Sequence, residues 1–337
     1  MKRERGTEIG KIGRTDILKI DNMKILENKD GLMRRVLLIA VLSFVAVAGC
    51  SEPEAPPPQP KHIESNAVTV TIGLIPEQNI FRQMDRYDPF ASYISKKLGI
   101  KIKLKVLPRY GNIIDNFVSE GMDGAFFGSF TYALAHAKLG VEVLARPEDN
   151  EGRSTYHGLV LVRKDSLIRT AADMKGKRFA FVDKATTAGY LLPLAYFKKH
   201  GIGDYKTYLK EVYFAGTHEG VIEDVLNKKA DIGAAKNTVF DRLAMADERI
   251  KNELLVLDQS PEVPENGLAV RKDLDSTLKK KLKEALLNMQ NDPDGKNVLN
   301  RFGAKKFIET TEKDYGPVIA YAKEIGLNLS NYDYMNK

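Results

Sequence analysis

Cysteine is almost absent from this chain of 337 residues. The only one is Cys50, so the folded part can hold no internal disulfide. The sequence also lacks H-x-x-x-H and paired-cysteine spacings, a P-loop, a dinucleotide-binding glycine loop and a G-x-S-x-G turn. We therefore expect no metal and no cofactor, and no motif indicates an enzyme.

Charge of one sign is also scarce where the chain is expected to fold. The formal net charge is +7, but residues 1–49 hold ten Lys/Arg against six Asp/Glu, which leaves +3 for the rest. Such a small and dispersed charge argues against a nucleic-acid partner. After Cys50 no apolar run is long enough to cross a membrane.

Residues 33–49 have the pattern of a bacterial lipoprotein signal peptide. A basic start, Met33-Arg34-Arg35, precedes an apolar run over 36–48, and small residues directly precede Cys50. This order predicts that Cys50 is lipidated and becomes the first residue of the mature chain; a plain secretory signal or a short membrane anchor is the alternative. We expect a protein of the cell envelope, on the periplasmic side and lipid-anchored to the membrane.

The segments on either side of this signal are not expected to fold. Residues 1–32 have mixed charge and fit no signal peptide, so we interpret them as an upstream extension from a mis-assigned start, with Met33 or Met23 as the initiator. Residues 50–66 are polar and rich in proline, which predicts an extended, solvated tether.

From Ala67 onward, short apolar strands alternate with amphipathic helices, a pattern that predicts parallel sheets covered on both faces. The expected strands are 68–75, 101–107, 124–127, 141–145, 158–163, 178–182, 211–215, 231–235, 253–257 and 268–271. The expected helices are 81–98, 111–120, 129–138, 187–199, 218–228 and 238–246, followed by a helical C-terminal third from Leu274.

Two β-rich segments, 158–163 and 268–271, bracket the central block and end in similar basic, aspartate-containing turns. They predict two mixed α/β lobes joined by two crossing strands, with a ligand cleft between them. Lobe 1 would comprise 67–157 and 265–337, and lobe 2 would comprise 158–264. The alternative, one doubly wound sheet, would need nine or more strands in a single layer.

Polar turns follow five of the expected strands, at the sheet ends where α/β proteins bind ligands. The turn Thr186-Thr187-Ala188-Gly189 combines hydroxyls with the free N–H groups and positive dipole end of a helix, which suits a small oxyanion. An ordinary helix N-cap is the alternative interpretation. Three further turns also carry hydroxyls, and the fifth offers Arg109 and Tyr110, so together they predict a donor-rich cleft for a tetrahedral oxyanion.

Two of the five histidines are candidate ligand contacts. His157 lies near the expected hinge and His218 at a helix start, so either could face a ligand. We interpret His62, His136 and His200 as structural.

An ordered series of motifs over residues 68–325 resembles the phosphate-, phosphite- and phosphonate-binding proteins of ABC importers. The motifs are I-G-L-I-P-E, P-R-Y-G-N-I-I, D-G-A-F-F-G-S-F-T-Y-A, Y-H-G-L-V-L-V-R-K-D-S, A-T-T-A-G-Y-L-L-P and A-G-T-H-E-G. The resemblance implies a two-lobed, type II periplasmic-binding-protein fold that closes over a small phosphorus oxyanion. It also implies an ABC permease and ATPase complex as the partner.

The resemblance implies a set of ligand-binding residues: Tyr110, Phe127, Ser129, Tyr156, His157, Thr186, Thr187, Ala188, Gly189, His218 and Asn266. Ala188 and Phe127 depart from the family pattern, because each removes a hydroxyl. Where aminoalkylphosphonate binders carry acids, this chain has Val239 and Asn266, with Glu265 nearby. This departure favours phosphate, phosphite, a simple alkylphosphonate or another small anion.

The sequence thus predicts a monomeric, lipid-anchored substrate-binding component of an ABC importer. A ligand-sensing accessory protein for a membrane kinase would have the same fold and is the alternative. An enzyme built on this scaffold is the third hypothesis.

Overall fold

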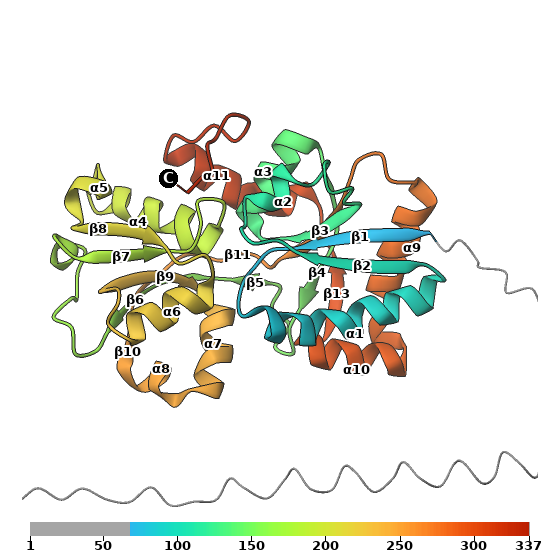
Figure 1. The fold of residues 1–337 in the computed structure, drawn as a ribbon, viewed down its shortest axis with the longest axis horizontal. Coiled ribbons are helices and arrows are strands. Elements are labelled where there is room, and N and C mark those ends of the chain that lie inside the picture. Colours follow the sequence, from blue (N-terminus) through green and yellow to red (C-terminus); the bar gives the residue numbers. More distant parts are fainter. Residues whose placement is uncertain (1–67, 337) are drawn as a thin grey trace, which may run out of the picture. The chain divides into compact units, whose positions relative to one another are not determined.

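Two separate β-sheets form the centres of two lobes (Figure 1). The first sheet has the strand order β13-β4-β12-β3-β1-β2, and the second has the order β10-β6-β9-β7-β8. This computed structural model describes residues 68–336. The predicted two-lobed α/β fold is confirmed, and a single doubly wound sheet is excluded. The predicted extension, signal peptide, tether and lipidated Cys50 lie outside the described residues.

The first lobe is built on the six-stranded sheet. Its strands are β1 (Thr69–Leu74), β2 (Lys101–Val106), β3 (Gly124–Phe127), β4 (Glu142–Glu148), β12 (Gly267–Val270) and β13 (Lys306–Glu309). Its helices are α1 (Ile80–Leu98), α2 (Asn112–Asp115), α3 (Ser129–Leu139), α9 (Ser276–Leu287) and α10 (Pro293–Phe302). Helix α11 (Gly316–Glu324) contacts both α3 of this lobe and α4 of the other.

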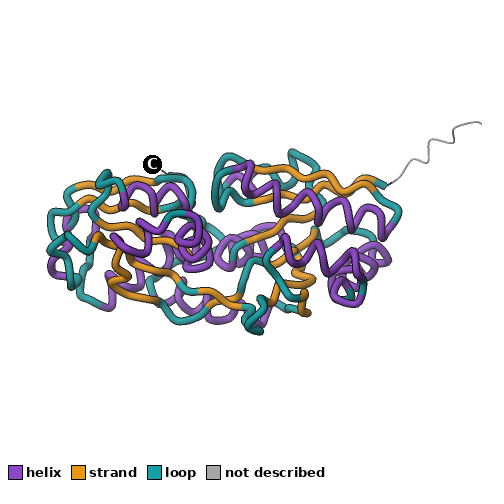
Figure 2. Tube along the Cα trace, turned by 90° about the horizontal axis from the view of Figure 1, so that it is seen from below, coloured by secondary structure: helices purple, strands orange, loops and turns teal. Residues whose placement is uncertain are grey.

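The second lobe is built on the five-stranded sheet. Its strands are β6 (Gly158–Arg163), β7 (Arg178–Phe181), β8 (Glu211–Phe214), β9 (Ile232–Lys236) and β10 (Leu254–Gln259). Its helices are α4 (Leu192–Lys199), α5 (Tyr205–Tyr208), α6 (His218–Leu226), α7 (Asn237–Ala246) and α8 (Glu248–Glu253). Helices flank the strands of both lobes, as the view turned by 90° also shows (Figure 2).

Both sheets are mixed, so the prediction of parallel sheets is wrong in part. Strands β1, β2 and β3 are parallel, as are β7, β8 and β9, but β12 runs antiparallel to β3, and β6 runs antiparallel to β9. Strands β6 and β12 directly follow the short linker strands β5 (Thr155–Tyr156) and β11 (Val263–Pro264). Both strands enter their sheets directly from these linkers, and an apolar pattern alone does not specify the direction in which a strand runs.

Two further predictions of secondary structure are wrong. The expected helix over 111–120 is reduced to α2, after which the chain turns. The regular helical hydrogen bonding is interrupted there, because the Phe117 N–H donates to the Ile114 carbonyl and the Gly121 N–H to the Val118 carbonyl, each three residues back. The expected wholly helical C-terminal third contains strand β13, a four-residue edge strand that pairs with β4.

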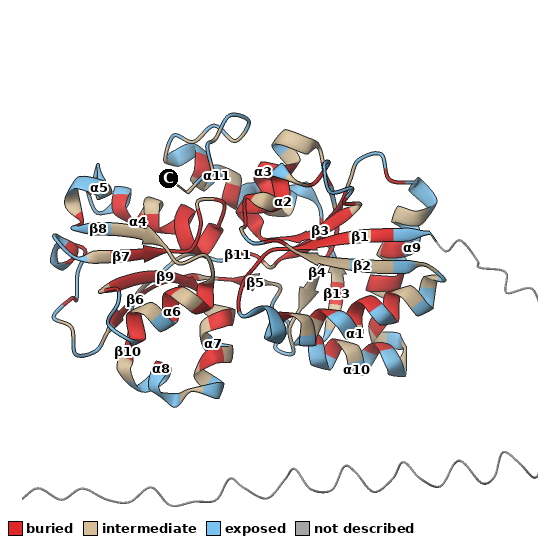
Figure 3. Ribbon diagram, in the orientation of Figure 1, coloured by how far each residue is buried: buried red, intermediate tan, exposed pale blue. Residues whose placement is uncertain are grey.

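Buried residues lie along the strands and on parts of the helices that cover them (Figure 3). In lobe 1, the rings of Phe90, Phe126 and Phe302 pack with centroids 5.4 to 6.0 Å apart. Another cluster of buried apolar side chains includes residues of both lobes and of the linkers, so an apolar core continues through the boundary between the lobes. No helix within residues 68–336 has the length and apolar character needed to cross a bilayer.

Candidate functional site

The chain passes between the lobes twice, and the two linker strands pair with each other at the boundary. Strands β5 and β11 are antiparallel, with Tyr156 opposite Val263 and Thr155 opposite Pro264. This short ladder gives the two lobes a common hinge. It also holds the Tyr156 side chain, which is buried, at the boundary.

The turn Thr186–Gly189 lies buried between β7 and α4. A π-helical turn over Thr187–Leu191 replaces the first α-helical turn expected there, and it continues into α4. The first N–H groups of any helix have no acceptor within that helix. The Thr186 hydroxyl donates to the Asp183 carbonyl at 2.6 Å rather than capping the helix.

Close packing explains the glycine in this turn. A Cβ placed on Gly189 would lie 2.4 Å from the Cβ of Val182. Such a distance is far inside normal contact, so any side chain here must displace the end of β7. The glycine therefore lets the turn approach the strand that precedes it.

The N-terminus of α3 faces this turn from the other lobe. The Phe130 N–H donates to the Thr187 hydroxyl oxygen at 2.8 Å, and the Thr131 hydroxyl donates to the Ala185 carbonyl at 2.8 Å. The Ser129 hydroxyl donates to the Pro264 carbonyl in the hinge. The positive dipole ends of two helices, each equivalent to about half an elementary charge, therefore point at one region.

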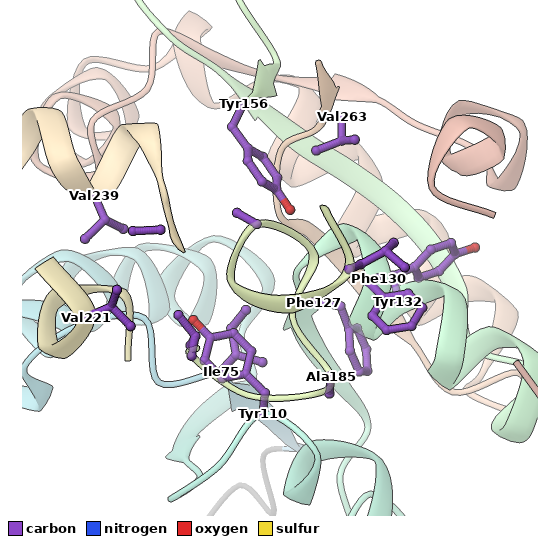
Figure 4. Close-up of a cluster of buried hydrophobic side chains, with 14 of the residues drawn as sticks. Ile75, Tyr110, Phe127, Phe130, Tyr132, Tyr156, Ala185, Val221, Val239 and Val263 are labelled. Atoms are coloured by element: carbon purple, nitrogen blue, oxygen red, sulfur yellow. The ribbon is translucent and has the colours of Figure 1, made fainter. Parts of the chain in front are cut away.

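Two tyrosine rings enter the same region from opposite sides (Figure 4). The Tyr156 hydroxyl is hydrogen-bonded with Thr187 and Ser129, and burial raises its pKa. The Tyr110 hydroxyl is buried and has no hydrogen-bond partner among the described residues. Burial also raises the pKa of Tyr110 well above its usual value, so its hydroxyl keeps its proton and remains a donor.

His218 supplies a further neutral donor at the start of α6. Its ring packs against that of Tyr110 with centroids 5.9 Å apart, and its Nδ1 accepts from the Lys236 N–H at 3.2 Å. Burial lowers the pKa of His218 to about 3, so the imidazole is uncharged near neutral pH. Because Nδ1 accepts, the proton lies on Nε2, and the Nε2–H group is a donor.

Asp183, which precedes the turn, connects it to lobe 1 and to the C-terminal segment. Its carboxylate lies 3.5 Å from the Arg109 guanidinium of lobe 1 and accepts from the Asn336 amide at 2.8 Å. The Asn336 side chain also accepts from the Lys184 N–H at 3.1 Å. Burial raises the pKa of Asp183 despite these partners. The last residues of the chain thus hold the turn in place.

Most residues predicted for the site therefore lie together, namely Tyr110, Ser129, Tyr156, Thr186, Thr187, Ala188, Gly189 and His218. Phe127 packs against Phe117 in the same core. His157 differs, because its ring binds the hinge: Nδ1 lies 2.8 Å from the Ser260 carbonyl and Nε2 lies 3.6 Å from Glu262. Its role as a ligand contact stays a prediction.

Lys236 and Glu77 were missed by the sequence analysis. Both side chains are buried, and they form an ion pair of 3.1 Å across the boundary between the lobes. Asn266, which was predicted, accepts from the same ammonium at 3.2 Å. The sequence offers one signal for Lys236: it is a lysine at the end of an otherwise apolar strand, and the structure shows this strand to be fully buried.

The lobes meet at one further set of contacts beside Glu77. The Arg82 guanidinium pairs with Glu219 at 2.9 Å, and the His218 N–H donates to the Glu77 carbonyl at 3.1 Å. The described structure is thus a closed arrangement, in which both lobes contribute to one buried donor cluster.

Comparison with known proteins identifies the family. The model for the ABC transporter, phosphonate, periplasmic substrate-binding protein matches residues 72–315. The chain is 29% identical over 296 residues to the phosphonates-binding periplasmic protein of Escherichia coli K12, covering 86% of this chain and 85% of that protein. It is 24% identical over 279 residues to a probable ABC transporter phosphite-binding protein of Prochlorococcus marinus, covering 79% and 91%.

Solved structures agree on the fold. The binding protein component of an ABC phosphonate transporter from Pseudomonas aeruginosa superposes with a TM-score of 0.73 at 24% identity, covering 77% of this chain and 87% of that one. The two-lobed type II periplasmic-binding-protein fold is therefore confirmed. Because the family match spans most of the two lobes, the chain belongs to the phosphonate ABC-transporter periplasmic substrate-binding proteins.

Proposed function

We propose that this protein binds a small phosphorus oxyanion between its lobes and delivers it to the membrane permease of an ABC importer. The observation that carries the proposal is the opposition of two helix N-termini at the Phe130–Thr187 hydrogen bond. Two positive dipole ends repel each other when nothing lies between them, and an anion removes that repulsion. The names of the two relatives reported above point to the same class of ligand, phosphonate and phosphite.

The donors suit an oxyanion and not a cation. Tyr110 offers a hydroxyl that has no partner in the described part of the chain, and His218 offers a neutral Nε2–H. Thr187 offers a hydroxyl that accepts from the Phe130 N–H and still has its own proton to donate. Because the donors come from both lobes, the ligand stabilises the closed state in proportion to its differential affinity for that state. We infer that the permease recognises this closed state.

We also infer that the site holds its ligand without chemical conversion. The donors are neutral hydroxyls, an imidazole and backbone N–H groups, and none is paired with a base that would make it a nucleophile. Within residues 68–336, no group of three or more His, Cys, Asp or Glu is placed to hold a metal ion. Turnover of a phosphate or phosphonate ester by the purified protein would contradict this inference.

The remaining part of the proposal concerns the cell envelope. We infer that Cys50 carries the lipid and that residues 50–66 tether a monomeric domain to the periplasmic side of the membrane. Metabolic labelling with a fatty acid tests this. The wild type should incorporate label and sediment with membranes, whereas a Cys50→Ser variant should do neither.

Isothermal titration calorimetry of the purified full chain tests the ligand. Phosphate, phosphite and methylphosphonate are titrated separately in phosphate-free buffer, with sulfate as a comparison. Saturable binding of at least one phosphorus oxyanion is expected. If none of the three binds, the proposed function is wrong.

A further inference from the structure

Lys236 places a charged ammonium inside the molecule, where such groups are found only with partners. Its side chain is 3% exposed. The ammonium binds the carboxylates of Glu77, at 3.1 Å, and of Glu265, and it donates to the Asn266 side chain at 3.2 Å. It also lies 4.4 Å from the centre of the Tyr156 ring, in cation–π geometry. All its polar side-chain partners lie outside the lobe 2 sheet that carries it.

This cluster adjoins the oxyanion site. The Tyr156 ring that covers the ammonium carries the hydroxyl bonded with Thr187 and Ser129. The Lys236 N–H orients the His218 ring. A substituent on a phosphorus atom held by these donors therefore has Lys236 and its carboxylates as neighbours.

The carboxylates of Glu77 and Glu265 are ionised, and the positive charge of Lys236 already pairs with them. Burial alone would raise the pKa of Glu77, but Lys236 and then Arg242 outweigh it and hold that pKa well below its usual range. Burial alone would lower the pKa of Lys236, but Glu265 and Glu77 outweigh it and raise that pKa. The protein's own ammonium thus neutralises the acids that would attract a ligand cation.

A small cavity lies beside this cluster, and several cationic side chains line it. This cavity of about 80 Å³ is lined by four cationic side chains and three carboxylates, namely Lys236, Arg86, Arg153, Arg242, Glu77, Asp149 and Glu265, together with Asn266. It adjoins the Lys236 cluster, with which it shares Glu77, Glu265 and Asn266. A ligand ammonium entering it would meet like charge, because Lys236 already occupies the contact with both glutamates.

We propose that Lys236 sets the ligand class of this site: it acts as an internal substitute for a ligand ammonium, so the site takes phosphorus oxyanions without a cationic substituent and rejects aminoalkylphosphonates. This inference rests on the proposed function. It gives Lys236, which is not one of the oxyanion donors, a role in ligand specificity.

The test compares two ligands that differ by one cationic arm, methylphosphonate and 2-aminoethylphosphonate, by calorimetry on the full chain. Wild type should bind methylphosphonate with a dissociation constant at least about tenfold lower. Lys236→Ala removes the ammonium and leaves room for that of the ligand. It should shift the ratio of the two constants by at least about tenfold toward 2-aminoethylphosphonate.

Two control variants accompany it. Lys236→Arg keeps the charge and should keep the preference of the wild type. Lys279→Ala removes a lysine that pairs with Glu142 on lobe 1, and it should change neither constant. Near-ultraviolet circular dichroism verifies the fold of each variant. If Lys236→Ala fails to fold, the wild-type comparison still decides the proposal.

The outcomes separate the two proposals. Equal affinity of wild type for both ligands, or a preference for the amine, overturns the role of Lys236 while the proposed function stands. A folded Lys236→Ala variant that keeps the wild-type ratio overturns it as well. Failure of wild type to bind methylphosphonate, phosphite or phosphate refutes the proposed function itself.

Discussion

The Phe130 N–H in lobe 1 donates a 2.8 Å hydrogen bond to the hydroxyl oxygen of Thr187 in lobe 2. This bond joins the first turns of α3 and of the π-helical segment before α4. The two helices thus meet end to end at their positive poles, with hydroxyls and not carboxylates between them. Helix N-termini are groups with which proteins bind small anions.

Replacing Thr187 by valine is expected to weaken ligand binding about tenfold or more. The substitution keeps the shape of the side chain and removes the hydroxyl that links Phe130, Tyr156 and the proposed oxyanion. Calorimetry with the best ligand measures the change. Thr170→Val is the matched control, because its hydroxyl only binds Asp173 in an exposed turn; unchanged affinity in Thr187→Val would show that this hydroxyl does not touch the ligand.

Tyr110→Phe should lower affinity and leave stability intact. The hydroxyl is buried and has no partner within residues 68–336, so its removal costs the unliganded protein nothing and can raise the melting temperature. A hydrogen bond to a charged ligand is worth about 1.5–3 kcal/mol, so affinity should fall about ten- to a hundredfold. Calorimetry and thermal unfolding are measured together.

Tyr315→Phe serves as the comparison for this prediction. The Tyr315 hydroxyl is also buried without a partner within the described residues, but it lies against Gly267 in lobe 1. Its removal should leave affinity unchanged. Equal effects of the two substitutions would mean that loss of a buried hydroxyl, and not of a ligand contact, explains the result.

Gly189→Ala is expected to destabilise the protein by about 1–3 kcal/mol, because the new methyl group overlaps the Val182 side chain at 2.4 Å. Urea unfolding measures the loss, and binding should weaken because the turn is displaced. Gly203→Ala adds a methyl group where, apart from the adjacent residues, no atom of the described chain lies within 4 Å, and should be close to neutral. A fully stable Gly189→Ala protein would contradict the close approach of turn and strand.

Buried, neutral His218 predicts a loss of stability in acid. Its pKa is about 3 in the folded protein, against an ordinary value of 6.5. Between these values the unfolded chain binds a proton that the folded chain does not. The contribution of this group is therefore complete above pH 6.5 and is lost as the pH falls toward 3, with a slope of at most about 1.4 kcal/mol per pH unit.

Urea unfolding of wild type and His218→Gln between about pH 4 and pH 7 measures this dependence. Glutamine keeps an N–H donor near the Nε2 position but does not titrate. The variant should lose less stability than wild type over this range, since the other titrating groups are common to both. Identical pH slopes would show that His218 does not titrate as burial demands.

Local sequence pattern was sufficient for much of the fold. Strand β3 occurs at the predicted Gly124–Phe127, and β6 at the predicted Gly158–Arg163, because short apolar runs between turn residues form buried strands wherever they pack. The direction of β6 and β12 was not predictable in this way. An apolar pattern carries no information on the direction of a strand. The antiparallel direction of β6 and β12 is set where the chain passes from one lobe to the other.

The sequence by itself determined the class of site, since hydroxyls and a glycine at Thr186–Gly189 precede a helix whose N–H groups are free. Only the tertiary structure decided what faces this turn. It set the N-terminus of α3 against Thr187, left the Tyr110 hydroxyl without a partner among residues 68–336, and brought Glu77 and Glu265 to Lys236. These residues are 159 and 29 positions from Lys236 along the chain, so no local pattern links them. Their association depends on closure of one lobe upon the other, which places charges from separate segments in one buried volume.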